Sequence, residues 1–126
     1  AMAGVGASDI GYINAHGTAT LDNDKTEARA INDVFGEASV PVSSTKRYMG
    51  HTLAAAGGVE AVVSVWALTR KLLPANLGLR MPLDDAKLDL VGETREAPGL
   101  RHVLSNSFGF GGNNAALVFT GSNNGP

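Results

Sequence analysis

The segment Ile10–Thr20, which reads Ile-Gly-Tyr-Ile-Asn-Ala-His-Gly-Thr-Ala-Thr, largely decides the expected fold. Its first five residues predict a short strand, and the glycine and threonines that follow His16 predict a turn. A helix is expected next, because Asp22–Asp24 offer N-cap side chains, Glu27 adds an acid to the first turn, and Gly36 is a stop signal. Turns between a strand and a helix are where a rigid scaffold usually presents reactive groups.

The same construction recurs in the segment Val40–His51, Val-Pro-Val-Ser-Ser-Thr-Lys-Arg-Tyr-Met-Gly-His. Its first five residues predict a second strand, and a long helix is expected from about Gly50 to Leu73. This helix is apolar nearly all round, so we expect it to be buried on most sides, in a middle layer of an α/β protein. Its only acidic residue, Glu60, needs a cation or hydrogen bonds, and Lys46 is the nearest candidate partner.

A third turn of this kind lies near the end of the chain. Residues 101–106 and 115–120 predict two antiparallel neighbouring strands, joined by the glycine-rich turn Asn106–Asn114. Residues 75–98 are irregular, with a short strand or turn expected within 83–90. The order strand-helix-strand-helix-strand-strand predicts an α/β fold with a mixed sheet, and three such turns indicate one site assembled from all of them.

The composition narrows the class of protein. The 126 residues suit one domain, and 44% hydrophobic and 17% charged residues indicate a globular chain. A net charge of −2 argues against binding nucleic acid or an anionic membrane through bulk charge. The absence of cysteine excludes a disulfide or a thiolate nucleophile within this chain, and it is compatible with a reducing compartment. Residues 53–68 are apolar but interrupted by glycines, a glutamate and a serine, so no membrane span is predicted.

The three turns carry the candidate chemistry. A neutral His16 imidazole could exchange a hydrogen bond with a reacting carbonyl group. His51 is expected at the start of the long helix, whose dipole disfavours the charged imidazole, and Lys46 would add to that effect in a shared pocket. The backbone of Gly109–Gly112 could aim N–H groups at an oxyanion, and the flanking glycines would let Phe110 swing as a gate.

Each of these motifs also has a plainer interpretation. The histidines could satisfy loop backbone groups, Lys46 and Glu60 could be surface and boundary residues, and the last turn could be a hairpin with a buried aromatic ring. Phe108 is expected to be a packing residue. Three rival sites have weaker patterns: a phosphate loop, a metal triad of His16, His51 and His102, and a nucleophile among Ser43, Ser44 and Ser107.

Three ordered motifs, Asn14–Thr18, Ser43–His51 and Asn106–Gly112, resemble the C-terminal part of β-ketoacyl-[acyl-carrier-protein] synthases of the I/II type. The likeness runs from about Ile10 to Thr120. It implies a thiolase-like fold, a five-layer αβαβα sandwich of two pseudo-symmetric halves, of which this chain is the C-terminal half-domain. The half-domain would be incomplete, because in the family one further strand, central in the sheet, and one helix precede Ile10. Unpaired strand edges, an exposed apolar patch on the helix from Gly50 to Leu73, and self-association are then expected.

The resemblance also implies a role for each motif. The reaction would be decarboxylative Claisen condensation of malonyl-carrier protein with an acyl thioester, an acyltransferase reaction of fatty-acid synthesis or of related polyketide or polyene synthesis. His16 and His51 would stabilise the enolate, and Lys46, paired with the supporting Glu60, would orient the site. Phe110, Gly109 and Gly111 would form the gate and contribute to the oxyanion hole. Thr18 and Thr20 would line the channel for the pantetheine arm. Some family members hold a structural cation, at positions that correspond to Asn14, Glu60, Ser105 and Asn106.

The family further implies no cofactor and a cytoplasmic location. The partners would be acyl carrier protein, malonyl-carrier protein and the N-terminal half of the same enzyme, with a homodimer for the full-length protein and no nucleic acid or membrane. The nucleophilic cysteine belongs to the N-terminal half, so the isolated chain is expected to be inactive. A non-condensing chain-length or carrier-protein-binding partner with the same fold is the alternative. Residues 9–121 are expected to form the domain, 1–8 a flexible lead or cloning remnant and 122–126 a flexible tail.

Two departures from the family pattern bear on substrate preference. Leu21–Asp24 stands where the family usually has proline and glycine, and Asn113 stands where it commonly has threonine. Neither change touches the two histidines or Lys46. The departures therefore concern which acyl chain is accepted, and whether the pathway makes fatty acids or a specialised polyketide or polyene.

Overall fold

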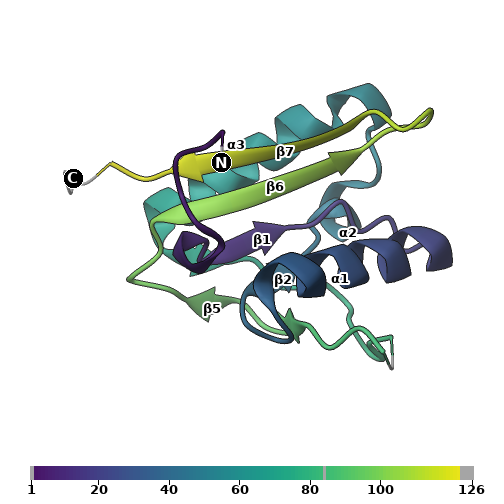
Figure 1. Cartoon of the computed structure of the whole chain (residues 1–126), viewed down its shortest axis with the longest axis horizontal. Coiled ribbons are helices and arrows are strands. Elements are labelled where there is room, and N and C mark those ends of the chain that lie inside the picture. The colour runs from purple at the N-terminus through teal and green to yellow at the C-terminus, as the bar shows by residue number, and fades with distance from the viewer. Residues whose placement is uncertain (1, 84, 123–126) are drawn as a thin grey trace.

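A five-stranded mixed sheet organises the computed structural model, which describes residues 2–83 and 85–122 (Figure 1). The strand order is β4-β2-β1-β6-β7. Strand β1 pairs in parallel with both β2 and β6, β2 pairs in parallel with β4, and β6 and β7 are antiparallel. The strands span Tyr12–Asn14 (β1), Pro41–Ser43 (β2), Asp89–Leu90 (β4), His102–Phe108 (β6) and Asn114–Thr120 (β7). The predicted mixed sheet and the antiparallel final pair are confirmed.

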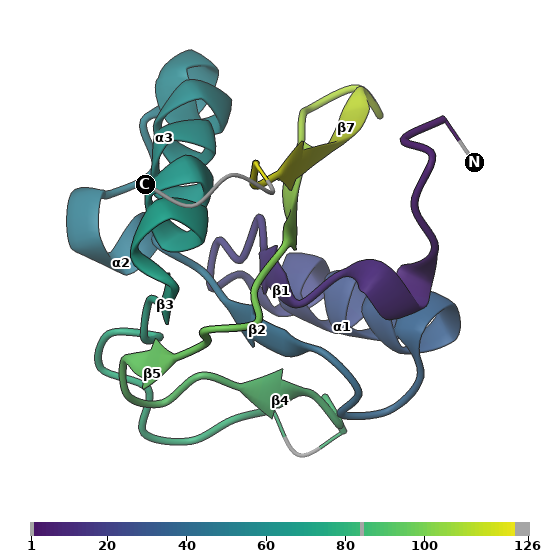
Figure 2. The same ribbon diagram turned by 90° about the vertical axis from the view of Figure 1, so that its left-hand side faces the viewer.

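Helices cover both faces of this sheet (Figure 2). Helix α1, Leu21–Phe35, lies against one face, and α3, Ala56–Arg70, packs on β6 and β7 from the other. The short elements are two 3-10 turns, η1 (Ala7–Asp9) and η2 (Leu53–Ala55), the single-turn helix α2 (Lys46–Met49), and a separate antiparallel pair, β3 (Leu72–Leu73) with β5 (Arg95–Glu96). The result is three layers, helix-sheet-helix.

The hydrophobic core is divided between the two faces of the sheet. Successive side chains of a strand point to opposite faces, so neighbours on β1 enter different clusters. Tyr12 joins Ala67 and Leu68 of α3, whereas Ile13 joins Ile31 of α1. Both β1 side chains are 0% exposed. The Tyr12 hydroxyl lies 2.6 Å from Ser43 Oγ and links β1 to β2 directly.

The ends of helix α1 were only partly predicted. Gly36 ends the helix as expected, with φ of +87°, and its N–H donates to the Asn32 carbonyl. The predicted N-cap was wrong, because the helix begins at Leu21 with Thr20 as N-cap, so Asp22–Asp24 lie inside its first turn.

Part of the predicted flexible lead is ordered. Ala7–Asp9 form η1, and Val5 packs against the core cluster that contains Ile13 and Ile31. Residues 123–126 of the predicted tail lie outside the described residues.

The predicted helix from Gly50 to Leu73 proved shorter. It begins at Ala56, because Gly50 and Leu53 adopt left-handed φ values of +79° and +51° that an α-helix excludes. It ends at Arg70, where Lys71 takes the left-handed C-cap conformation, and Leu72–Leu73 form β3 instead. By length and hydropathy, Leu53–Arg70 would suffice to cross a membrane, but this stretch contains the η2 turn and a buried ion-paired glutamate.

Helix α3 is buried along one side only. The expectation of burial on most sides was wrong, whereas the apolar patch expected from an incomplete half-domain is present. Its buried residues are confined to the stripe Ala56, Glu60, Ser64, Ala67 and Leu68. Val62, Val65 and Trp66 on the other side are 70%, 49% and 43% exposed. A contiguous exposed apolar face on a helix marks a surface that associates.

The expectation of unpaired strands at the centre of the sheet was also wrong. Strand β1 occupies the central position and is hydrogen-bonded on both sides, to β2 and to β6. The open edges are β4 and β7, which lie at the margins of the sheet. Self-association of the chain would therefore proceed through α3 or through the margins of the sheet, and not through a gap in its middle.

We expect the 126-residue chain to self-associate through the exposed face of α3, because association removes Val62, Val65 and Trp66 from water. A Val62→Lys, Val65→Lys double variant should shift the mass measured by light scattering toward the monomer. Val34→Lys is the matched control, since Val34 is 63% exposed but lies on α1. A wild-type chain that stays monomeric at high concentration would contradict this expectation.

Candidate active site

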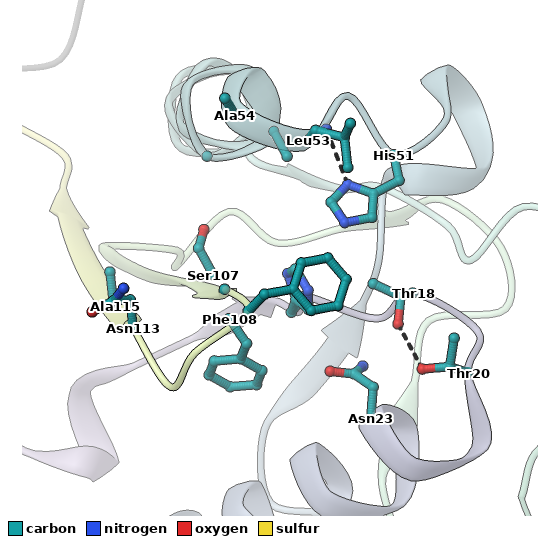
Figure 3. A pocket seen from close by; sticks show the side chains of 15 residues that line it. Thr18, Thr20, Asn23, His51, Leu53, Ala54, Ser107, Phe108, Asn113 and Ala115 are labelled. Carbon is teal, nitrogen blue, oxygen red and sulfur yellow. Dashed lines mark hydrogen bonds between the residues drawn. The ribbon is translucent and has the colours of Figure 1, made fainter.

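The three turns named by the sequence line one cavity of about 650 Å³ (Figure 3). It lies between the loop after β1, the segment that precedes α3 and the β6–β7 turn. Its lining includes His16, Thr18, Thr20, His51, Phe108 and Phe110. The structure thus brings together both histidines, both threonines and Phe110 of the β6–β7 turn.

His16 is held by its backbone as well as by its side chain. The preceding Ala15 N–H extends the sheet by donating to the Ser43 carbonyl at 2.9 Å. The N–H groups of His16 and Gly17 each donate to one carboxylate oxygen of Glu27, both at 2.9 Å. Glu27 also accepts from Asn106 Nδ2 at 3.2 Å, so one buried carboxylate fastens the His16 loop to α1 and to β6.

The contribution of Glu27 to this site was not predicted from the sequence. Its position in the first turns of a helix suggested only a favourable interaction with the helix dipole. Burial raises the pKa of this carboxyl above its usual range, and the N–H donors of Gly17 and His16 act in the opposite direction. A signal was available, since Glu27 lies on the same helical face as the apolar positions Ala28 and Ile31, which are buried.

Lys46 and Glu60 form a buried ion pair beside His16. The lysine ammonium contacts Glu60 Oε1, and the side chains are 8% and 2% exposed. The same ammonium nitrogen lies 3.3 Å from His16 Nδ1. The predicted pairing of Lys46 with Glu60 is therefore present, and it places a positive charge directly against one nitrogen of the His16 ring.

This environment keeps His16 uncharged. Its pKa is lowered to about 4, first by burial, then by the charge of Lys46 and third by His51, while Asp24 acts weakly in the opposite direction. Neutral imidazole is therefore the species present at neutral pH.

Hydrogen-bond partners fix the tautomer of both imidazoles. An ammonium can only donate, so His16 Nδ1 must accept and its proton sits on Nε2. In His51 the Leu53 N–H donates to Nδ1 at 3.2 Å, which again assigns the proton to Nε2. The ring centroids lie 5.5 Å apart at an interplanar angle of 87°. Figure 3 shows the second nitrogen of His51 directed into the cavity, so the site can offer two N–H donors.

The position of His51 differs from the prediction. It is an exposed residue that precedes the η2 turn, not the first residue of the long helix. The helix-dipole argument for His51 therefore fails, and the local contact with the Leu53 N–H takes its place.

The two phenylalanines of the β6–β7 turn have different surroundings. Phe110 is 97% exposed, which excludes the interpretation of the turn as a hairpin with a buried aromatic ring at this position. The ring centroid of Phe108 lies 5.4 Å from that of His16. Phe108 lines the cavity and belongs to neither core cluster. The Gly109 N–H donates to the Asn113 carbonyl at 2.8 Å, so it is not available to an oxyanion. Gly111 adopts a left-handed φ of +82° within the turn.

The remaining predicted positions divide into two groups. Thr18 and Thr20 line the cavity with their hydroxyl oxygens 3.0 Å apart. Among the suggested cation positions, Asn14 Nδ2 donates to the Glu60 carbonyl at 3.2 Å, and Asn14 pairs in register with Ser105 on β6. Glu60 Oε2 is buried and accepts no hydrogen bond from the described residues. Glu60 Oε2 is thus the open acceptor among these positions, whereas the Asn106 amide is turned toward Glu27.

The metal triad that the sequence left open does not form. His102 begins β6, and its Nδ1 lies 2.9 Å from Thr120 Oγ1. It is absent from the cavity that His16 and His51 line. Within residues 2–83 and 85–122, no group of three His, Cys, Asp or Glu side chains is placed to hold a metal ion.

Comparisons with known proteins agree on one family. Residues 1–80 match the family described as "Beta-ketoacyl synthase, C-terminal domain". The 3-oxoacyl-[acyl-carrier-protein] synthase 2 of Vibrio cholerae serotype O1 is 43% identical over 121 residues, which cover 93% of this chain and 29% of that protein. The chain therefore spans less than a third of the length of this curated relative.

Solved structures give the same result. The ishigamide ketosynthase/chain length factor superimposes with a TM-score of 0.91 at 38% identity, covering 95% of this chain and 30% of that one. A second solved structure gives a TM-score of 0.86 at 30% identity, covering 91% of this chain and 29% of that one. It is described as a type II PKS acyl-carrier protein in complex with its ketosynthase bound to the hexaketide. The thiolase-like half-domain predicted from the sequence is confirmed, and it is incomplete relative to these chains.

Acid should destabilise the fold through His16. An unfolded histidine takes up a proton near pH 6.5, but folded His16 does so only near pH 4. Between these values the unfolded state binds more protons, so the His16 contribution to stability is full above pH 6.5 and is lost as the pH falls toward 4. Denaturant unfolding over this range should show a shallower decline for His16→Gln than for the wild type. Equal slopes would mean that His16 titrates normally in the folded state.

Glu27 should be needed for the shape of the His16 loop. Glu27→Ala leaves two backbone N–H groups without their acceptor, which should cost about 1–3 kcal/mol of unfolding free energy. Glu27→Gln keeps one acceptor oxygen and should lose less. Glu37→Gln is the matched control, because Glu37 pairs with Lys87 at an exposed position and should matter little. A Glu27→Ala variant as stable as this control would contradict the role.

Proposed function

Because the chain belongs to the β-ketoacyl synthase family as its C-terminal domain, we propose that it supplies the malonyl-decarboxylating part of a condensing enzyme. The reaction is the joining of malonyl-carrier protein to an acyl thioester with loss of carbon dioxide. The activity belongs to the full-length protein. This chain has no cysteine, so the thiol that carries the acyl group has to come from outside it.

One observation carries the proposal: His16 and His51 line the same cavity, and in each ring a hydrogen-bond donor at Nδ1 leaves Nε2 as the nitrogen that can donate to a substrate. When the carbon–carbon bond to the malonyl carboxylate breaks, its electron pair enters the thioester as an enolate, and negative charge develops on the carbonyl oxygen. Two N–H donors fixed in advance stabilise that charge without reorganising. The enolate carbon then attacks the acyl thioester and displaces the thiolate, which completes the new bond.

Lys46 and Glu60 support this chemistry without contacting the enolate. The lysine charge holds His16 Nδ1 as an acceptor, so the proton stays on Nε2, and Glu60 compensates the lysine charge in the interior. A cation of the kind that some family members hold would lend positive charge at Glu60 Oε2 and would use Asn14 and Ser105 oxygens as further ligands.

The cavity lining suits a long, flexible thioester. Thr18 and Thr20 present hydroxyl groups that can bond the amides of a pantetheine arm. Phe110, fully exposed on a glycine-rich turn at the cavity, can move without disturbing the core and would act as the gate. Acyl carrier protein is the expected partner, which is consistent with its presence beside the related ketosynthase.

The alternative is a partner subunit that keeps the fold without condensing, since one structural neighbour is described as a ketosynthase/chain length factor. The presence of His16 and His51 in one cavity, with Lys46 against the His16 ring, favours the enzyme. A cysteine at the nucleophile position of the full-length protein would decide for condensation. A residue without a nucleophilic side chain at that position would decide for the partner.

The full-length enzyme should lose decarboxylation when either imidazole is removed. His16→Ala and His51→Ala should each lower carbon dioxide release from a malonyl thioester on the order of a hundred- to a thousand-fold, as for loss of an oxyanion donor. Acylation of the nucleophile should survive in part, since both imidazoles act on the enolate. His102→Ala provides the matched control, because this histidine lies outside the cavity and should leave the rate unchanged. Normal release by either His variant would overturn the proposed function.

A further inference from the structure

The side chain of Asn76, in the loop after β3, occupies the place of a strand residue beside the end of β2. Its Oδ1 accepts from the Ser44 N–H at 2.9 Å, and its Nδ2 donates to the Val42 carbonyl at 3.1 Å. Its backbone N–H donates to the Val91 carbonyl at 2.7 Å. A carboxamide carries one acceptor and one donor group, as a peptide unit does, so Asn76 prolongs the β2 ladder past its last residue.

Ser44, the residue fixed by Asn76, joins two parts of the candidate site. Its hydroxyl donates to the Gly17 carbonyl at 2.9 Å, on the loop that carries His16. The same oxygen accepts from the Lys46 N–H at 3.4 Å. Ser44 therefore contacts the backbone of both segments whose side chains meet at the Lys46–His16 contact.

The approach of these two segments depends on glycine. A Cβ atom added to Gly17 would lie 2.4 Å from Ser44 Cβ and 2.8 Å from Ser44 Oγ, and φ at Gly17 is +40°. Any side chain at Gly17 would therefore push the two loops apart. Because backbone and hydroxyl are in direct contact, a shift of Ser44 must move the Gly17 carbonyl or break its hydrogen bond.

We propose that Asn76 and Ser44 are positioning residues, which together hold Lys46 against His16 in the geometry that decarboxylation needs. Neither residue lines the cavity, so they act through the two loops and not on substrate. The kinetic consequence rests on the proposed function. The structural consequence, a fixed contact between Lys46 Nζ and His16 Nδ1, does not depend on it.

Two readouts separate positioning from a merely structural role. The first is the rate of decarboxylation by the full-length enzyme, where loosening of the loops should lower kcat on the order of ten- to a hundred-fold with little change in KM. The second is the nitrogen-15 chemical shift of His16 Nδ1 at neutral pH, followed by NMR on histidine-labelled enzyme. Nδ1 accepts from the Lys46 ammonium, so withdrawal of the lysine should move this chemical shift away from its wild-type value.

Asn76→Ala and Ser44→Ala should each produce both effects, and the double variant should lose little more than either single one, because the two residues belong to one chain of hydrogen bonds. Asn32→Ala is the matched control. Asn32 also donates from a half-buried amide to a backbone carbonyl, that of Ala86 at 2.7 Å, but on α1 and away from both loops. It should lower the melting temperature and leave kcat and the His16 Nδ1 chemical shift unchanged.

The outcomes are distinguishable. The proposal is overturned if both loop variants behave like Asn32→Ala, losing stability while kcat and the His16 Nδ1 chemical shift stay at wild-type values. If Asn76→Ala does not fold, Ser44→Ala decides alone, since it removes only one hydroxyl at the surface between the loops. If the enzyme shows no decarboxylation but the His16 Nδ1 chemical shift still moves in the variants, positioning stands and the proposed function fails.

Discussion

The buried ion pair between Lys46 and Glu60 is the interaction on which the rest of this structure depends. It joins the segment after β2 to the N-terminal half of α3, and its lysine reaches the ring of His16 just after β1. Removing charges from water is expensive, so an isolated lysine or glutamate at these positions would be strongly destabilising. Each charge is tolerated because the other is present, and together they commit three elements of the fold to one arrangement.

The same pair sets the chemistry of the cavity. A positive charge at Nδ1 of His16 directs the ring proton to Nε2 and opposes a second proton. The second buried carboxylate, Glu27, acts differently, because it accepts backbone N–H groups and fixes the loop on which the imidazole is carried. Glu60 thus compensates the charge of Lys46, whereas Glu27 fixes the backbone of the His16 loop. Asn76 and Ser44 extend this support from the side of β2.

Much of the architecture could be predicted from the sequence, because glycines, histidines and threonines mark the ends of elements. The pairing of Glu60 with Lys46 could be predicted, because a single carboxylate on an apolar, buried helix requires a partner. The start of α3 could not be predicted, because the left-handed backbone of Leu53 has no sequence signal. The burial of α3 was overestimated, because an apolar composition shows only how much surface a helix can bury. The chain covers 29% of the length of the Vibrio cholerae relative. Glu27 and Asn76 were missed because their roles arise from loops that meet only in the folded state.

The hydrogen bonds at Nδ1 of His16 and His51 require that both rings carry their proton on Nε2. Nitrogen-15 NMR of the histidine side chains in the full-length enzyme at neutral pH tests this directly, because protonated and unprotonated ring nitrogens have well-separated chemical shifts. The account predicts that each ring shows a protonated Nε2 and an unprotonated Nδ1. A ring with both nitrogens protonated, or with the proton on Nδ1, would contradict it, since that imidazole would not be the neutral Nε2–H donor that the hydrogen bonds from Lys46 and Leu53 require.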